Sequence, residues 1–136
     1  MKDRRDFLKA TAAVTAGIVT SRVVPALAYG GSSFPAGVVY TKDNPGKWAG
    51  KVGSHAPVVT INGRKVTIET KHPMSEAHFI VRHTLVSSTG EVLGDATFTG
   101  TDKKALSEYE VPAGHSDLYA TSFCNQHDFW VTEFVI

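Results

Sequence analysis

The stretch Pro57-Val58-Val59-Thr60-Ile61-Asn62-Gly63-Arg64-Lys65-Val66-Thr67-Ile68-Glu69-Thr70-Lys71 decides the fold class. A β-branched, apolar run ends at Asn62-Gly63, the dipeptide that most strongly indicates a short hairpin turn. After the turn, apolar and polar residues alternate, which places Val66, Ile68 and Thr70 on one face of a strand. The stretch therefore predicts an antiparallel hairpin with one buried face.

Further short strands follow this hairpin at regular spacing. β-branched and aromatic runs between turn residues lie at Phe79–Ser87, Glu91–Thr99, Leu106–Val111, Leu118–Phe123 and Phe129–Val135. After residue 28, no window of the sequence has a convincing helical period. Seven short strands in roughly 80 residues predict an all-β fold, an immunoglobulin-like antiparallel β-sandwich.

The first 28 residues have the features of an export signal. A charged stretch with Arg4-Arg5 precedes a mildly apolar run over residues 10–19 and an Ala-x-Ala motif that ends at Ala28. The arginine pair followed by Phe-Leu-Lys resembles the twin-arginine signal, and the alternative is an amphipathic helix of the folded domain. The apolar run is too short and too polar to span a membrane. We therefore expect cleavage after Ala28 and a periplasmic mature protein without a membrane span.

The chain is expected to contain one folded domain. We predict a twin-arginine signal over 1–28, a loop-rich extension over 29–53 that is rich in Gly, Ser and Pro, and a β-sandwich domain over 54–136. The net charge of +1 comes from the signal, because the remaining chain has nine basic and eleven acidic residues. A nucleic-acid partner is not indicated, because the sequence lacks a basic patch with interleaved aromatic residues.

The only cysteine of the chain, Cys124, lies three residues before His127. A lone cysteine cannot form an internal disulfide, so it is a buried side chain, a nucleophile or a metal ligand. A Cys-x-x-His spacing in a tight turn lets the thiolate and the imidazole reach one point, and three other histidines lie at loops or strand edges. The candidate metal ligands are His55, His72, His78, Cys124 and His127.

Four imidazoles and one thiolate make a five-coordinate set with one open position. Such a set argues against a structural zinc site, which is tetrahedral and usually richer in cysteine. Blue copper would use fewer histidines and commonly an axial methionine, for which Met74 is available. Square-pyramidal iron with an axial sulfur fits better. The rival interpretation makes Cys124 a catalytic nucleophile with His127 as its base, although no oxyanion motif accompanies them.

Two further histidines have structural interpretations. His83 shares a strand face with Phe79, Val81 and Leu85, which predicts a hydrogen-bonded interior or edge residue. His115 follows Pro-Ala-Gly, which predicts a solvated turn.

Three motifs resemble, in order and spacing, the superoxide reductases of the neelaredoxin and desulfoferrodoxin family. They are His55-Ala56-Pro57-Val58-Val59, His72-Pro73-Met74-Ser75-Glu76-Ala77-His78-Phe79-Ile80 and Cys124-Asn125-Gln126-His127-Asp128-Phe129-Trp130. The resemblance extends from about Gly46 to the C-terminus. It implies an immunoglobulin-like sandwich, a mononuclear iron with four equatorial histidines and an axial cysteinate, and one-electron reduction of superoxide to hydrogen peroxide. With one cysteine, the chain resembles the one-iron form, which lacks a rubredoxin-like domain.

The sequence departs from the family directly before the first ligand histidine. Family members usually carry Glu-Lys there, and this chain has Gly53-Ser54. The family glutamate closes the sixth position of oxidised iron, and the lysine supplies positive charge near the substrate. Lys51, four residues before His55, is the candidate substrate-guiding cation, and Lys47 is a weaker candidate. The departure leaves open a non-catalytic iron-binding or electron-transfer module, and a partner-bound accessory sandwich is a third hypothesis.

The resemblance also implies partners. Superoxide would be the substrate, and a small redox protein of the rubredoxin or cytochrome kind would supply the electrons. Many family members are homo-oligomers, so the resemblance leaves a homo-oligomer open. The axial thiolate would donate electron density to the iron, as it does in haem-thiolate sites.

Overall fold

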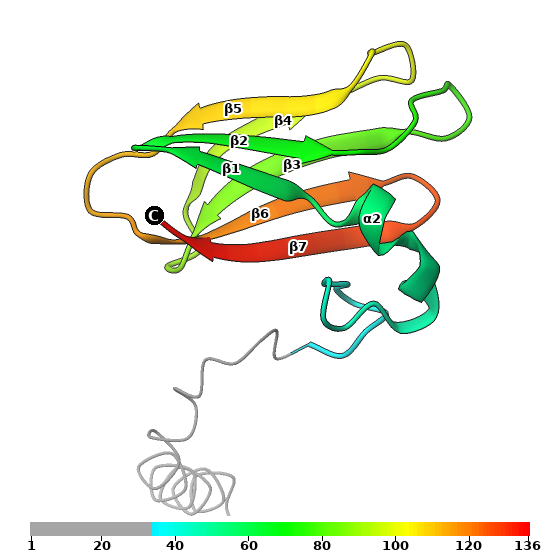
Figure 1. Cartoon of the computed structure of the whole chain (residues 1–136), viewed down its shortest axis with the longest axis horizontal. Coiled ribbons are helices and arrows are strands. Elements are labelled where there is room, and N and C mark those ends of the chain that lie inside the picture. The colour runs from blue at the N-terminus through cyan, green and yellow to red at the C-terminus, as the bar shows by residue number, and fades with distance from the viewer. Residues whose placement is uncertain (1–33) are drawn as a thin grey trace, which may run out of the picture. The chain divides into compact units, whose positions relative to one another are not determined.

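The computed structural model describes residues 34–136, so the predicted signal and the first residues of the extension lie outside the described part. Within residues 34–136, seven strands form two antiparallel sheets that pack as a sandwich (Figure 1). The strands are β1 (Val58–Asn62), β2 (Lys65–Thr70), β3 (Ile80–Ser87), β4 (Val92–Thr97), β5 (Ala105–Glu110), β6 (Asp117–Cys124) and β7 (Asp128–Val135). The predicted fold class is confirmed.

The hairpin that decides the fold forms as predicted. Asn62 of β1 pairs with Lys65 of β2, and Gly63 between them has a φ of 62°, which glycine adopts without steric cost. Alternate residues of β2 are buried, as the alternating pattern requires. One sheet has the strand order β1-β2-β5 and the other β4-β3-β6-β7, and the buried face of β2 lies between them.

The two ends of the sandwich have different interiors. At one end Thr70 pairs with Ala105 and Ile80 pairs with Cys124, and we call this the Cys124 end. Its buried apolar clusters are small: one consists of Ile80, Ala105 and Cys124, and the other, beside His55, consists of Tyr40, Ala56 and Trp130. The main cluster lies toward the opposite end and consists of Val66, Ile68, Leu85, Val111, Leu118 and Ala120.

The residues before β1 are attached to the sandwich through Tyr40. Its backbone N–H donates to the carbonyl of Phe129, and its carbonyl accepts from the N–H of Val131, both at 2.9 Å. Tyr40 thereby forms a parallel bridge with Trp130, and both side chains are buried together. The described part of the predicted extension is thus packed on β7, while the domain boundary at residue 54 stays a prediction.

Two short helical segments precede β1 where the sequence predicts only loop, so that prediction is wrong here. They are η2, a 3-10 helix over Gly46–Lys51, and α2, one α-helical turn over Val52–His55. Each is too short to produce a visible apolar period, and each is held by packing, since Trp48 and Val52 contact the Tyr40–Trp130 cluster. Among residues 34–136, no helix is long and apolar enough to cross a membrane.

Candidate metal centre

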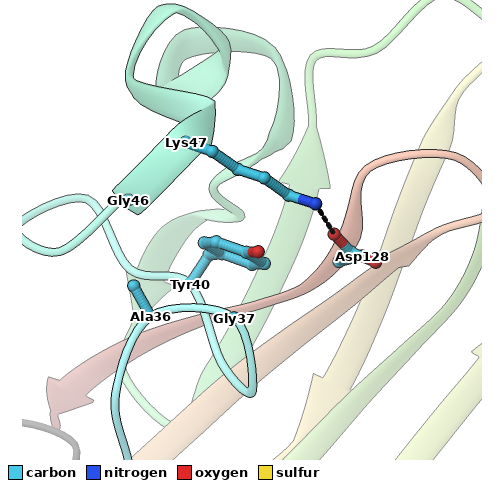
Figure 2. Close-up of a pocket in the computed structure, with 6 residues that line it drawn as sticks. All are labelled: Ala36, Gly37, Tyr40, Gly46, Lys47 and Asp128. Atoms are coloured by element: carbon cyan, nitrogen blue, oxygen red, sulfur yellow. Dashed lines mark ion pairs between the residues drawn. The ribbon is translucent and has the colours of Figure 1, made fainter.

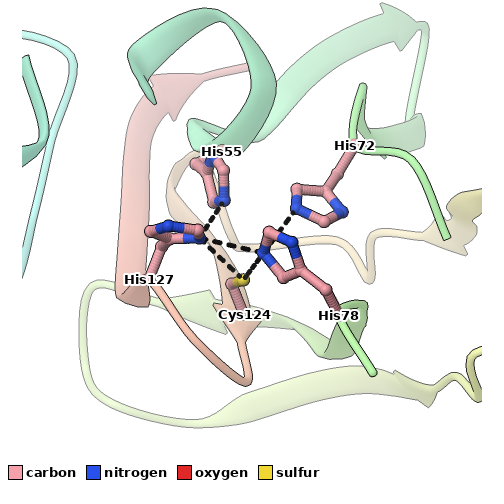
Figure 3. Close-up of side chains that lie close together, drawn as sticks. All are labelled: His55, His72, His78, Cys124 and His127. Carbon is pink, nitrogen blue, oxygen red and sulfur yellow. Dashed lines mark hydrogen bonds between the residues drawn. The ribbon is translucent and has the colours of Figure 1, made fainter. Parts of the chain in front are cut away.

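Five side chains from three parts of the chain meet at the Cys124 end (Figure 3). His55 ends α2, His72 and His78 lie in the loop between β2 and β3, and Cys124 and His127 flank the β6–β7 turn. Their ligand atoms all lie within 4.8 Å of one another. The structure therefore brings together all five residues that the sequence predicts as metal ligands. We call this group the His4Cys cluster.

The spacing of the nitrogen atoms fits a single ion. His78 Nε2 lies 3.0 Å from His72 Nε2 and 2.9 Å from His127 Nδ1. His127 Nδ1 lies 3.1 Å from His55 Nε2. Four nitrogens in a square, each about 2.1 Å from one centre, would be about 3.0 Å apart along an edge. The observed contacts match three edges of such a square.

The sulfur position agrees with the same centre. Cys124 Sγ lies 3.3 Å from His78 Nε2 and 3.6 Å from His127 Nδ1. A sulfur about 2.3 Å from the centre and perpendicular to the nitrogens would lie about 3.1 Å from them. A nitrogen-rich set of five donors suits iron better than a tetrahedral structural zinc. The His4Cys cluster could therefore bind a single iron.

The cluster is buried on its protein side. Cys124 is 1% exposed, His55 2% and His72 7%, whereas His78 and His127 are half-buried. Burial, followed by the charge of His72, lowers the pKa of His55 to about 4. Burial and the charge of His78 also lower the pKa of His72 and of His127. These three imidazoles are therefore neutral near pH 7, which is the state that binds metals.

The helical turn of α2 fixes the tautomer of His55. Its Nδ1 lies 3.1 Å from the carbonyl oxygen of Lys51 and 2.8 Å from Ser54 Oγ. A carbonyl only accepts, so Nδ1 carries the proton and the lone pair of Nε2 faces the cluster. His72 differs, because its Nδ1 is buried and has no hydrogen bond of ordinary geometry among the described residues. The backbone of Pro73 offsets part of the lowering of the His72 pKa.

The β6–β7 turn is hydrogen-bonded to the loop that carries His78. Asn125 Oδ1 accepts from the N–H of Phe79 at 3.0 Å. Asn125 Nδ2 and Gln126 Nε2 both donate to the carbonyl of Ala77, at 3.1 and 2.9 Å. These two amide side chains fix the ligand-bearing loops relative to each other. No role for these two residues is predicted from the sequence, where their only signal is a place in a tight turn between two candidate ligands.

The two candidate lysines have different surroundings. Lys47 lies 4.0 Å from Asp128 Oδ2, beside a pocket of about 380 Å³ that Tyr40 and Asp128 also line (Figure 2). Lys51 is exposed at the end of η2, and its charge lowers the pKa of His72 and of His127. Of the two lysines, Lys51 is the one whose charge lowers the pKa of cluster histidines.

The remaining two histidines lie outside the cluster. His83 is fully buried and hydrogen-bonded, which confirms the prediction of an interior residue. His115 directly follows a turn at Ala113-Gly114, and it is not freely solvated as predicted, since its side chain is 23% exposed and its Nε2 lies 3.6 Å from Glu91 Oε2.

Comparison with known proteins agrees with this geometry. A profile of the desulfoferrodoxin family matches residues 47–133. A profile of the twin-arginine translocation signal matches residues 3–21, so the N-terminal segment is an export signal of this pathway. No curated protein sequence matches the chain.

Several solved structures share the fold. A neelaredoxin-type superoxide reductase variant from Ignicoccus hospitalis is 22% identical with a TM-score of 0.61, over 78% of this chain and 98% of that one. The one-iron superoxide reductase from Giardia intestinalis is 22% identical with a TM-score of 0.56, over 61% and 98%. The superoxide reductase from Treponema pallidum is 25% identical with a TM-score of 0.51, over 59% and 66%. Because the family profile spans well over half of the sequence and includes all five residues of the His4Cys cluster, the chain belongs to the desulfoferrodoxin family.

Proposed function

We propose that this protein is a superoxide reductase, which adds one electron and two protons to superoxide and releases hydrogen peroxide. The observation that carries the proposal is the convergence of four imidazoles and one thiolate within 4.8 Å, in a chain of the desulfoferrodoxin family. The proposed metal ligands are His55, His72, His78, Cys124 and His127. Bound iron would supply the one-electron couple between Fe(II) and Fe(III).

Cys124 and the imidazoles would prepare the site for this chemistry. The sulfur is almost fully buried, so the protein shields it from solvent and oxidants, and it would donate electron density to a bound metal. The imidazoles of His55 and His72 are buried, and this desolvation lowers their pKa values and keeps them neutral. Superoxide would approach from the side where His78 and His127 are partly exposed.

Lys51 would guide the superoxide anion. The charge of Lys51 lowers the pKa of His72 and of His127, which supports an electrostatic role for this side chain at the cluster. Among residues 34–136 Lys51 has no ion-pair partner, whereas Lys47 pairs with Asp128 and lies 4.7 Å from the ring of Trp48. A free cation near the cluster raises the local concentration of an anionic substrate.

Stopped-flow mixing of the Fe(II)-loaded protein with superoxide tests the proposal. We expect a fast second-order rise of the thiolate-to-iron(III) absorption that slows as ionic strength increases. Lys51→Ala should lower this rate about tenfold at low salt and weaken its salt dependence. Lys42→Ala, a matched loss of an exposed lysine from the same segment, should leave the rate close to that of the wild type.

The second candidate function is an iron-binding or electron-transfer module. The presence of Gly53-Ser54 at the place of the family Glu-Lys pair favours it. A thiolate-to-iron band that forms only slowly, and equally slowly in Lys51→Ala, would select this candidate over superoxide reduction. Failure to bind iron at all would eliminate both functions.

We further infer that the mature protein works in the periplasm and receives electrons from a small redox protein of the rubredoxin or cytochrome kind. The twin-arginine profile over residues 3–21 supports export. The proposed regions are the signal over 1–28, the extension over 29–53 and the iron-binding domain over 54–136. Replacing Arg4 and Arg5 with lysine should leave the uncleaved precursor in the cytoplasmic fraction. Sedimentation of the exported protein would show whether it forms the homo-oligomer that its family suggests.

A further inference from the structure

We propose that a buried hydrogen-bonded group positions His72 and Cys124 relative to each other independently of the metal. The group consists of Thr70, His83, Ser107 and Ser122 and lies inside the sandwich beside the His4Cys cluster. The proposal rests on the metal-binding part of the proposed function. It assigns a role to polar residues that do not themselves ligate the metal.

The group joins the two sheets across the interior. Thr70 Oγ1 is at its centre, 2.8 Å from His83 Nε2 and 2.7 Å from Ser122 Oγ. His83 Nδ1 lies 2.9 Å from Ser107 Oγ. Thr70 and Ser107 belong to the β1-β2-β5 sheet, whereas His83 and Ser122 belong to the β4-β3-β6-β7 sheet. All four residues are buried, and His83 and Ser122 are 0% exposed.

Two cluster residues lie two positions from members of this group, His72 just beyond the end of β2 and Cys124 at the end of β6. The N–H of His72 donates to the carbonyl of Thr70 at 2.8 Å, so the end of β2 fixes the backbone of His72. Ser122 and Cys124 are two residues apart in β6 and point to the same buried face. A continuous path therefore leads from His72 through Thr70 and Ser122 to Cys124 without passing through the metal.

Neutral side chains satisfy the whole group. A neutral imidazole has one donor and one acceptor nitrogen, and a hydroxyl can serve either one. Burial lowers the pKa of His83 to about 4, so the ring is uncharged at neutral pH. The ring of Phe98 packs against it at a centroid distance of 4.9 Å.

The hydrogen bonds of this group suit fixing the relative position of the two sheets better than simply holding the sheets together. Apolar side chains of similar size would also hold the sheets together, but apolar contacts are non-directional and allow the sheets to slide. Hydrogen bonds have a narrow range of length and angle, so they fix where Thr70 lies relative to Ser122. That placement determines how far the imidazole of His72 lies from the sulfur of Cys124, and metal geometry is sensitive to such supporting contacts.

Thr70→Val tests the proposal because it removes the central hydroxyl and nearly preserves the shape of the side chain. Thr84→Val is the matched control. Thr84 follows His83 in β3, points to the opposite face of the sheet and is hydrogen-bonded through its hydroxyl to Thr121. The iron(III)-loaded variants are compared by the thiolate-to-iron absorption band and by the rate at which a chelator removes the iron. The melting temperature of each metal-free protein is measured alongside.

We expect Thr70→Val to shift or broaden the absorption band and to release iron about tenfold faster than the wild type. Thr84→Val should change neither property, and Thr70→Ser, which keeps the hydroxyl, should retain the wild-type values. The proposal is overturned if Thr70→Val and Thr84→Val lower the melting temperature alike while band and release rate stay at wild-type values. If Thr70→Val does not fold, Ser122→Ala replaces it, with Ser87→Ala as its control in a buried serine of β3.

A second readout separates this proposal from the proposed function. If the wild-type protein binds no iron, metal binding fails as a function. The positioning role is then judged on the metal-free protein by the rate at which Cys124 reacts with a thiol reagent. A faster reaction in Thr70→Val but not in Thr84→Val supports the role, and equal rates in both variants overturn it.

Discussion

Trp48 Nε1 donates a 2.9 Å hydrogen bond to Asp128 Oδ2, which lies 80 positions later in the chain. This bond connects η2 with the residue that follows His127. The indole also lies edge-on to the imidazole of His127, with a centroid distance of 4.7 Å. A segment that precedes the first strand therefore restrains a candidate ligand near the C-terminus.

Trp48→Phe should destabilise the protein slightly. Phenylalanine keeps an aromatic ring beside His127 but removes the Nε1–H donor. The side chain of Asp128 is 48% exposed, so water replaces part of the lost bond, and we expect a loss of about 1 kcal/mol in the free energy of unfolding. Urea denaturation of the metal-free protein measures this value. A loss of about 4 kcal/mol would show instead that packing of the indole is the main restraint.

Gly100→Ala should disturb the loop between His72 and His78. A Cβ atom at Gly100 would lie 2.4 Å from the carbonyl oxygen of Ser75 and from Cα of Glu76, so one of the two backbones must move. We expect metal affinity to fall roughly tenfold, because the loop carries two of the candidate ligands. Calorimetric metal titration measures the effect.

Gly50→Ala is the control for this substitution, since a Cβ at Gly50 meets no atom within 4 Å. Equal metal affinities for Gly100→Ala and Gly50→Ala would contradict the idea that close approach of the β4–β5 loop holds the ligand loop in place.

Ser54→Lys should restore a cation directly before His55, where the family usually carries one. The tautomer of His55 should survive, because the carbonyl of Lys51 remains its partner at 3.1 Å. We expect the reaction with superoxide to become several-fold faster at low ionic strength and to depend more steeply on salt. Ser54→Gln, a neutral side chain of similar reach, controls for shape. Equal rates for the two variants would argue against a missing positive charge at this position.

The pKa of His83 predicts a loss of stability in acid. Burial lowers this pKa from 6.5 to about 4, so between these values the unfolded chain binds a proton that the folded protein does not. The protonation of His83 therefore costs no stability above pH 6.5. As the pH falls toward 4, it lowers the free energy of unfolding by roughly 3 kcal/mol. Denaturation of the metal-free protein at several pH values measures the slope.

His83→Gln provides the comparison, because glutamine can also hydrogen-bond to Thr70 but does not titrate in this range. The variant should have a smaller slope between pH 6.5 and 4, because residue 83 no longer binds a proton on unfolding. Identical slopes would mean that His83 does not bind a proton on unfolding in this range.

The sequence predicts the strands well because each depends on a local pattern. β2 is recognisable from its own alternation and from the turn at Asn62-Gly63, without knowledge of its neighbours. Four residues of the cluster are recognisable from close pairs, His72 with His78 and Cys124 with His127. His55 has no such partner nearby in the sequence, and its prediction depends on its place before a strand and on the resemblance to the family. The short helices η2 and α2 carry no such pattern, because fewer than seven residues cannot display an apolar period.

Contacts between distant strands could not be predicted. The sequence places His83 in the interior, but its partners Thr70 and Ser107 come from the opposite sheet, and nothing local in either strand pairs them with it. The packing of Tyr40 against Trp130 was missed for a similar reason. A short β-branched run around Tyr40 was a usable signal, yet its partner strand begins 88 residues later.

The unequal interiors of the two ends have a consequence for how the protein opens. The Cys124 end has two small apolar clusters beside the His4Cys cluster, whereas the main apolar cluster lies toward the opposite end. A bound ion would therefore stabilise one end of the sandwich against local unfolding, whereas apolar packing alone stabilises the other end. Metal loading should accordingly slow amide hydrogen exchange in the strand around Cys124 and leave the exchange rates around Val66 and Leu118 unchanged.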